Sequence, residues 1–153
     1  MSKPTIRDAT TADAPGIAAL VAEASIESFN GGPREGREYF LTMNSAAAII
    51  GKMQGGYRYH VAEDAGRMVG MIAMLNNAHV YHLFIASDTQ RRGLGRQLWE
   101  HARAECLRRG NPGRFTVFST PNAVGFYERH GFTVDGGLQT RNGLPAVPMK
   151  LGA

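Results

Sequence analysis

A short glycine-rich segment, Gln90-Arg91-Arg92-Gly93-Leu94-Gly95, has the residue types that bind an anionic ligand. It follows a segment typical of a strand and precedes one with helical periodicity, so it is expected at the start of a helix. The first amides of a helix have no partners within the helix, and the helix dipole adds partial positive charge there. The two glycines let a phosphate approach the backbone, and Arg91, Arg92 and Arg96 supply cations. This pattern predicts a site for a ligand with more than one phosphate, although the glycines could also serve only a tight turn.

Two common kinds of nucleotide site are disfavoured by this segment. A dinucleotide-binding fingerprint requires a third glycine, where this chain has Leu98. The chain also lacks the Gly-x-x-x-x-Gly-Lys-Ser/Thr run of a nucleotidase P-loop. The ligand is therefore expected to be of another kind.

The composition is typical of a globular protein with one domain, expected to cover residues 1–153. The 153 residues include 17 Lys plus Arg and 13 Asp plus Glu, a net charge of +4, and 43% of them are hydrophobic. No apolar run reaches the roughly 20 residues of a membrane helix, and the N-terminus has no apolar signal segment. A single cysteine, Cys106, excludes an intramolecular disulfide. We expect a cytoplasmic protein with no membrane partner.

Hydrophobic periodicity predicts that helices and strands surround the glycine-rich segment. Helices are predicted after residue 13, at about 35–53, from 94 to about 109 and at 122–129. Strands are predicted at 5–7, 57–62, 68–75, 79–85, 115–118, about 132–134 and 147–150. Together these elements indicate an α/β fold. Cys106 falls on the apolar stripe of the long helix, which favours a core position.

Two motifs of this chain resemble those of the GNAT superfamily of N-acetyltransferases. The glycine-rich segment matches the family's Gln/Arg-x-x-Gly-x-Gly/Ala signature, and 122–132 matches its second motif, Asn-x-x-x-x-Phe-Tyr-x-x-x-Gly-Phe. Their order and separation also agree, and the resemblance extends over nearly the whole chain. It implies a mixed, mostly antiparallel central sheet of about six to seven strands, flanked by about four helices. Two parallel strands of that sheet would splay apart to form the cofactor cleft.

The resemblance implies acetyl-CoA as the co-substrate. No metal is expected, because a spacing of three on a strand separates the side chains of His79 and His82 and no carboxylate accompanies them. The glycine turn would bind the pyrophosphate through backbone amides. The pantetheine arm would lie along the exposed backbone of the strand predicted at 79–85. The residues implied in cofactor binding are Leu83, Phe84, Ile85, Gln90, Arg91, Arg92, Gly93, Leu94, Gly95, Arg96, Asn122 and Tyr127.

The resemblance also assigns catalytic roles. Tyr127 would donate a proton to the leaving thiolate, although a tyrosine that only packs a helix against the sheet is the plain alternative. His79 is the first choice for the general base, with Tyr81 two residues on and on the same face. His82 would join them only if a bulge intervened. For His79 and for His82, a purely structural role in the sheet is an equal alternative.

The acceptor would lie against the first two helices, with Phe29, Asn30, Tyr39 and Phe40 as wall residues. The expected reaction is transfer of an acetyl group to a primary amine of a small molecule or peptide, by direct attack in a ternary complex. The alternative is a non-catalytic module that binds or senses acyl-CoA. A nucleic-acid partner is not expected, because no aromatic residues are interleaved with the arginines. Many relatives are dimers, so a homodimer is compatible with the resemblance.

Overall fold

The computed structural model describes residues 3–28, 34–90, 92–141 and 144–152. Within these ranges the chain forms eight strands: β1 (Thr5–Asp8), β2 (Tyr57–Asp64), β3 (Arg67–Leu75), β4 (His79–Ile85), β5 (Phe115–Ser119), β6 (Thr133–Val134), β7 (Gln139–Arg141) and β8 (Leu144–Leu151). They form one sheet in the order β1-β2-β3-β4-β5-β8-β6, with β7 also paired to β8. The pair β4–β5 is parallel and the other pairs are antiparallel. The predicted mixed, mostly antiparallel sheet is confirmed.

The same ranges contain five α-helices: α1 (Ala14–Ser28), α2 (Arg34–Met43), α3 (Ala46–Met53), α4 (Leu94–Arg108) and α5 (Val124–Arg129). Residues alternate between the two faces of the sheet, so neighbours on β3 join different cores. Ile72 packs in the core below α4 and α5, whereas Met71 packs in the core below α1 and α3. Among the described residues, no helix is both long and apolar enough to cross a membrane.

The structure differs from the predicted elements in two places. The helix expected at 35–53 is divided into α2 and α3, because Asn44 and Ser45 bond to the backbone instead of continuing the helix. The Asn44 side chain donates to the carbonyl of Phe40 (2.9 Å), and Ser45 Oγ accepts from the amide of Ala48 (3.2 Å) as a helix cap. Strand β7 was not predicted, since its residues are all exposed and have no apolar alternation.

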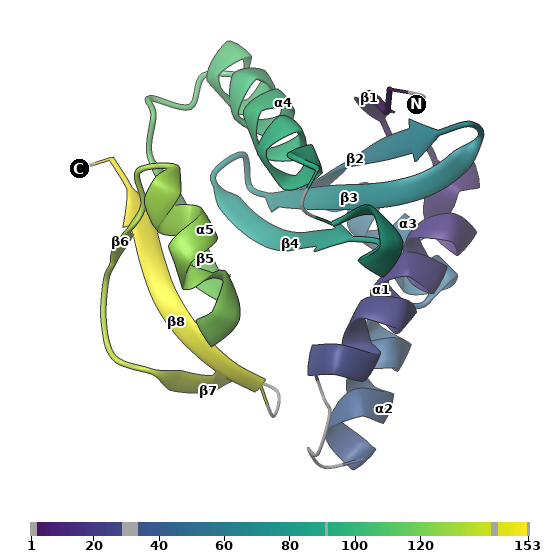
Figure 1. The fold of residues 1–153 in the computed structure, drawn as a ribbon, viewed down its shortest axis with the longest axis horizontal. Helices are drawn as coiled ribbons and strands as arrows, with labels where there is room; N and C mark the ends of the chain where they lie inside the picture. The colour runs from purple at the N-terminus through teal and green to yellow at the C-terminus, as the bar shows by residue number, and fades with distance from the viewer. Residues whose placement is uncertain (1–2, 29–33, 91, 142–143, 153) are drawn as a thin grey trace.

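Strands β4 and β5 separate soon after they pair (Figure 1). His79 and Val80 lie opposite Thr116 and Val117, and within the described residues the rest of β4 does not pair with β5. The backbone of β4 beyond Val80 therefore has an edge that β5 does not cover.

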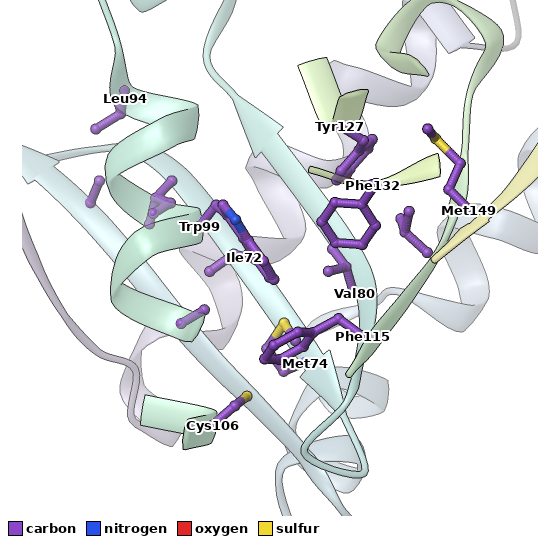
Figure 2. Close-up of a cluster of buried hydrophobic side chains, with 14 of the residues drawn as sticks. Ile72, Met74, Val80, Leu94, Trp99, Cys106, Phe115, Tyr127, Phe132 and Met149 are labelled. Carbon is purple, nitrogen blue, oxygen red and sulfur yellow. The ribbon is translucent and has the colours of Figure 1, made fainter. Parts of the chain in front are cut away.

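An aromatic core holds α4 and α5 against the sheet. Trp99 of α4 meets Phe115 of β5 edge-on, with ring centroids 5.1 Å apart, and lies 5.4 Å from Phe132. Figure 2 shows Trp99 between Ile72 and Phe132, with Cys106 on the same side of α4. The expected core position of Cys106 is confirmed, because its thiol is buried.

Candidate active site

A cleft of about 1640 Å³ lies along the uncovered edge of β4. It extends from β4 to the beginnings of α4 and α5, and α1 forms a further wall. Most of the residues predicted to bind the cofactor line this cleft: Leu83, Phe84, Ile85, Gln90, Gly93, Leu94, Gly95, Arg96, Asn122 and Tyr127. Arg92 is exposed and does not line it, and Arg91 lies outside the described residues.

The glycine turn leads directly into α4. Gly93 precedes the helix with φ of +75°, a left-handed conformation that glycine adopts without strain. A Cβ on Gly93 would meet no atom within 4 Å, so the residue keeps the surface beside the first amides of α4 open. The Gln90 side chain donates to the carbonyl of Ile85 (3.2 Å) and so ties the turn to the end of β4. This geometry suits an anion at the start of α4.

Cationic side chains stand on two sides of the cleft. Arg96 of α4 lines it and is paired with Glu100 at 2.8 Å. Arg129 and His130, at the end of α5, line it as well. Burial lowers the pKa of His130. The negative charge of Glu100 opposes this effect, and the positive charges of Arg96 and Arg129 add to it. Sequence reasoning missed Arg129 and His130, although their place two and three residues after Tyr127 in the second motif was a usable signal.

Tyr127 lies at the inner side of the cleft and is only 6% exposed. Its ring packs edge-on against Phe126 and Phe132, with centroids 5.2 and 5.3 Å away. Burial raises the pKa of the phenol well above its ordinary value, because the phenolate would be poorly solvated. The hydroxyl is therefore protonated at neutral pH, as a proton donor requires.

His79 lies where β4 and β5 are still paired. Its Nδ1 is 2.7 Å from Oγ1 of Thr116, and its ring lies 5.2 Å from that of Phe118. Burial lowers the pKa of His79, and the positive charge of Arg141 lowers it further. The imidazole is thus neutral at neutral pH, although it does not line the cleft itself.

A bulge in β4 brings Tyr81 and His82 to one face of the sheet. His82 lies opposite Ala73 and Val80 lies opposite Met74, so Tyr81 is the extra residue between them. The Tyr81 and His82 rings are only 4.2 Å apart. His82 therefore lies on the same face of the sheet as His79 and Tyr81, as expected from the sequence if the strand has a bulge.

The surroundings of His82 are largely aromatic. Its ring lies 5.6 Å from Phe40 of α2 and 5.0 Å from Phe84. Nδ1 is buried and has no hydrogen-bond partner among the described residues. Burial lowers the pKa of His82 to about 3, with a smaller contribution from the charge of Lys52.

The predicted acceptor wall is only partly brought together. Phe40 packs against His82, whereas Tyr39 is 51% exposed and neither residue lines the cleft. Phe29 and Asn30 lie outside the described residues. The helix wall that the structure does place along the cleft comes from α1 and consists of Leu20, Glu23, Ala24 and Ile26.

Glu23 is a carboxylate that sequence reasoning missed. Its Oε1 accepts hydrogen bonds from the amide of Ser87 (3.3 Å) and from Ser87 Oγ (3.0 Å), which connects α1 to the loop after β4. The signal was an acidic residue between Ala22 and Ala24 in the predicted first helix. Its position adds a negative charge at the α1 wall of the cleft.

Comparisons with known proteins agree with this fold. The acetyltransferase (GNAT) domain family matches residues 21–153. A GCN5-related N-acetyltransferase from Rhodopseudomonas palustris has a TM-score of 0.82 and 22% identity, over 98% of this chain and 96% of that chain. The PaiA N-acetyltransferase from Thermoplasma acidophilum, solved with coenzyme A, has a TM-score of 0.79 and 17% identity, over 97% and 98% of the two chains. YjaB from Escherichia coli has a TM-score of 0.69 and 24% identity, over 97% and 96%. No curated protein shows a significant match.

The family match covers most of the chain, so this protein belongs to the GNAT acetyltransferases, a family of acyltransferases. The resemblance inferred from the two motifs is confirmed.

Proposed function

We propose that this protein transfers an acetyl group from acetyl-CoA to a primary amine of a small molecule or peptide, by direct attack in a ternary complex. The observation that carries the proposal is the meeting of both sequence motifs on one cleft, along the part of the β4 edge that β5 leaves unpaired among the described residues. The PaiA relative, solved with coenzyme A, supports this choice of donor.

The cleft has separate features for the parts of acetyl-CoA. The start of α4, with Gly93 before it, suits the pyrophosphate, and Arg96 and Arg129 supply positive charge nearby. The uncovered backbone of Leu83–Ile85 suits the amide-bearing pantetheine arm, which would bind as an added strand. Asn122 lines the opposite side and offers a side-chain amide.

Acetyl transfer needs one proton removed and one supplied. The neutral amine nitrogen attacks the thioester carbonyl carbon, the C–N bond forms, and the C–S bond breaks with the electron pair leaving on sulfur. Tyr127 gives its phenolic proton to that sulfur, and the backbone amide near Ile85 is the proposed donor to the carbonyl oxygen. The buried, protonated state of Tyr127 supports its role.

His79 is the proposed base that takes the amine proton. Its lowered pKa keeps it neutral, and its hydrogen bond with Thr116 fixes the ring. Tyr81 would stand beside it on the same face. His82 is the second candidate, because the bulge directs it to this face. Its Nδ1 also has no hydrogen-bond partner among the described residues, so it is available to accept a proton.

Glu23 supports an amine as the acceptor. A carboxylate at the cleft attracts an alkylammonium ion, whose ordinary pKa near about 10.4 makes it cationic before deprotonation. Glu23 would therefore hold the incoming amine on the side of α1.

The test is release of free coenzyme A thiol from acetyl-CoA across a panel of amines, amino acids and peptides. Turnover with an acceptor is expected for the natural protein, with a loss of at least about 100-fold in kcat for Tyr127→Phe. Binding of acetyl-CoA, measured by calorimetry, should change less than about twofold. Tyr59→Phe is the matched control, since this buried tyrosine lies outside the cleft and its hydroxyl has no hydrogen-bond partner among the described residues.

Two results would oppose the proposal. Equal losses of turnover and of acetyl-CoA affinity in Tyr127→Phe would make Tyr127 a binding residue. Tight acetyl-CoA binding without thiol release for any acceptor would favour the alternative, a module that senses acyl-CoA.

A further inference from the structure

Three potential metal ligands from distant parts of the sequence meet on the sheet below α4, outside the cleft. Asp8 of β1 lies directly opposite His60 of β2 in the strand pairing. His101 of α4 packs on the same spot, with its ring 4.8 Å from that of His60. One potential ligand atom from each of the three residues lies within 4.8 Å of the others. None of the three lines the acetyl-CoA cleft.

The distances are close to those around a bound metal ion. His60 Nδ1 is 2.8 Å from Asp8 Oδ1, and His101 Nε2 is 3.5 Å from the same oxygen. Two ligand atoms of a tetrahedral zinc ion, each about 2.0–2.1 Å from the metal, are roughly 3.3 Å apart. These two pairs lie on either side of that value, and the ligand atoms of the two histidines lie within 4.8 Å of each other. Small rotations of the Asp8 and His101 side chains would therefore make room for an ion.

Burial and exposure suit a site that an ion can enter. The His60 side chain is fully buried, whereas those of His101 and Asp8 are 36% and 65% exposed. His60 thus gives a fixed ligand, and the other two close the site from the solvent side. Nε2 of His60 is buried without a hydrogen-bond partner among the described residues, so the polar contact of this ring is directed at Asp8.

The cluster is surrounded by charges of both signs. Glu105 and Arg108 act on Asp8, and Arg58 acts on His60.

We propose that Asp8, His60 and His101 form a binding site for a divalent transition-metal ion, with Zn²⁺ as the expected ligand. Two imidazoles and one carboxylate are a ligand set that zinc accepts, and water would complete its coordination on the exposed side. Because the ligands come from β1, β2 and α4, the ion would cross-link the helix to the edge of the sheet. Its effect is on stability, since the site is separate from the cleft.

The test uses protein without a histidine tag, stripped with a chelator and then freed of it. Titration with Zn²⁺ by calorimetry is expected to show one ion bound per chain with a Kd in the micromolar range or tighter. His101→Gln and Asp8→Asn should each weaken binding by about tenfold or more. The replaced side chains are partly exposed and the new ones are similar in size, so circular dichroism should show an unchanged fold. His130→Gln, at a partly buried histidine directly after α5, is the matched control and should bind Zn²⁺ like the natural protein.

A second readout follows stability. Zn²⁺ should raise the Tm of the natural protein and of His130→Gln but not that of His101→Gln, because an ion that binds only the folded chain stabilises it. The proposal is wrong if Zn²⁺ does not bind in the micromolar range, or if His101→Gln and Asp8→Asn bind it as the natural protein does. It is also wrong if His130→Gln loses as much affinity as they do.

Discussion

Gly95 of α4 lies against the ring of Phe126 of α5: a Cβ at position 95 would be 3.2 Å from Cε1 of Phe126. The glycine belongs to the first sequence motif and the phenylalanine to the second, so the two motifs are in direct contact. Both residues line the cleft. Gly95 therefore allows two helices to approach each other, in addition to leaving the backbone accessible as the sequence suggested.

We predict that Gly95→Val lowers the free energy of unfolding by about 1–3 kcal/mol, the usual range for overpacking. Gly95→Ala should have a smaller effect, because the better helix propensity of alanine, worth up to about 1 kcal/mol, offsets the displacement of Phe126. Urea unfolding measures both. Gly125→Val is the control, since a Cβ at position 125 would meet only the Arg129 side chain at 3.5 Å. Similar losses for Gly95→Val and Gly125→Val would disprove a specific contact.

Arg96 and Arg129 are expected to bind the phosphates of coenzyme A. Arg96→Gln and Arg129→Gln should each raise the Kd for coenzyme A by about three- to tenfold, which corresponds to the net value of a charge-assisted contact near the surface. Added salt should reduce the difference from the natural protein, because it screens exposed charges. Calorimetry at two salt concentrations measures this. Arg103→Gln, an exposed change on α4 outside the cleft, should leave the Kd unaltered.

The pH dependence of turnover distinguishes the two candidate bases. A base must be neutral to accept a proton, so kcat/KM should rise as the pH passes the pKa of the base and then reach a plateau. Burial places the pKa of His79 below its ordinary value of 6.5, and that of His82 at about 3. If His79 is the base, the rise should lie below pH 6.5 and disappear in His79→Gln, while His82→Gln retains it. A profile that keeps its rise in His79→Gln would remove this residue from the mechanism.

Glu23 is expected to bind the acceptor amine. Glu23→Gln should raise the KM for the amine about tenfold with little change in that for acetyl-CoA, because it removes charge but keeps an oxygen that can accept from Ser87. Steady-state kinetics with each substrate varied in turn measures both constants. Ser87→Ala is the control, because it removes the hydrogen bond from the Ser87 hydroxyl to Glu23 and keeps the negative charge of Glu23. If it raises the amine KM as much as Glu23→Gln does, Glu23 acts by holding the loop and not by binding the amine.

Much of the fold could be predicted because local patterns reflect local structure. The period-two alternation in β2 and the glycine turn before α4 are properties of consecutive residues, and both agree with the structure. The end of α2 before Asn44 was not predicted. Periodicity indicates one continuous helix there and does not reveal that the Asn44 side chain bonds to the backbone. The exposed β7 has no apolar pattern and is held only by its pairing with β8.

By itself, the sequence determined the family, the order of the elements and the stretches of chain from which the cleft is built, because motifs and periodicity are read along the chain. Only the tertiary structure decided which side chains lie close to one another. The bulge that turns Tyr81 and His82 to one face depends on pairing with β3. Glu23 reaches Ser87, and Asp8 meets His60 and His101, only after α1 and α4 have packed on the sheet. Such contacts join residues far apart in sequence, and their geometry is set by the packing of whole elements.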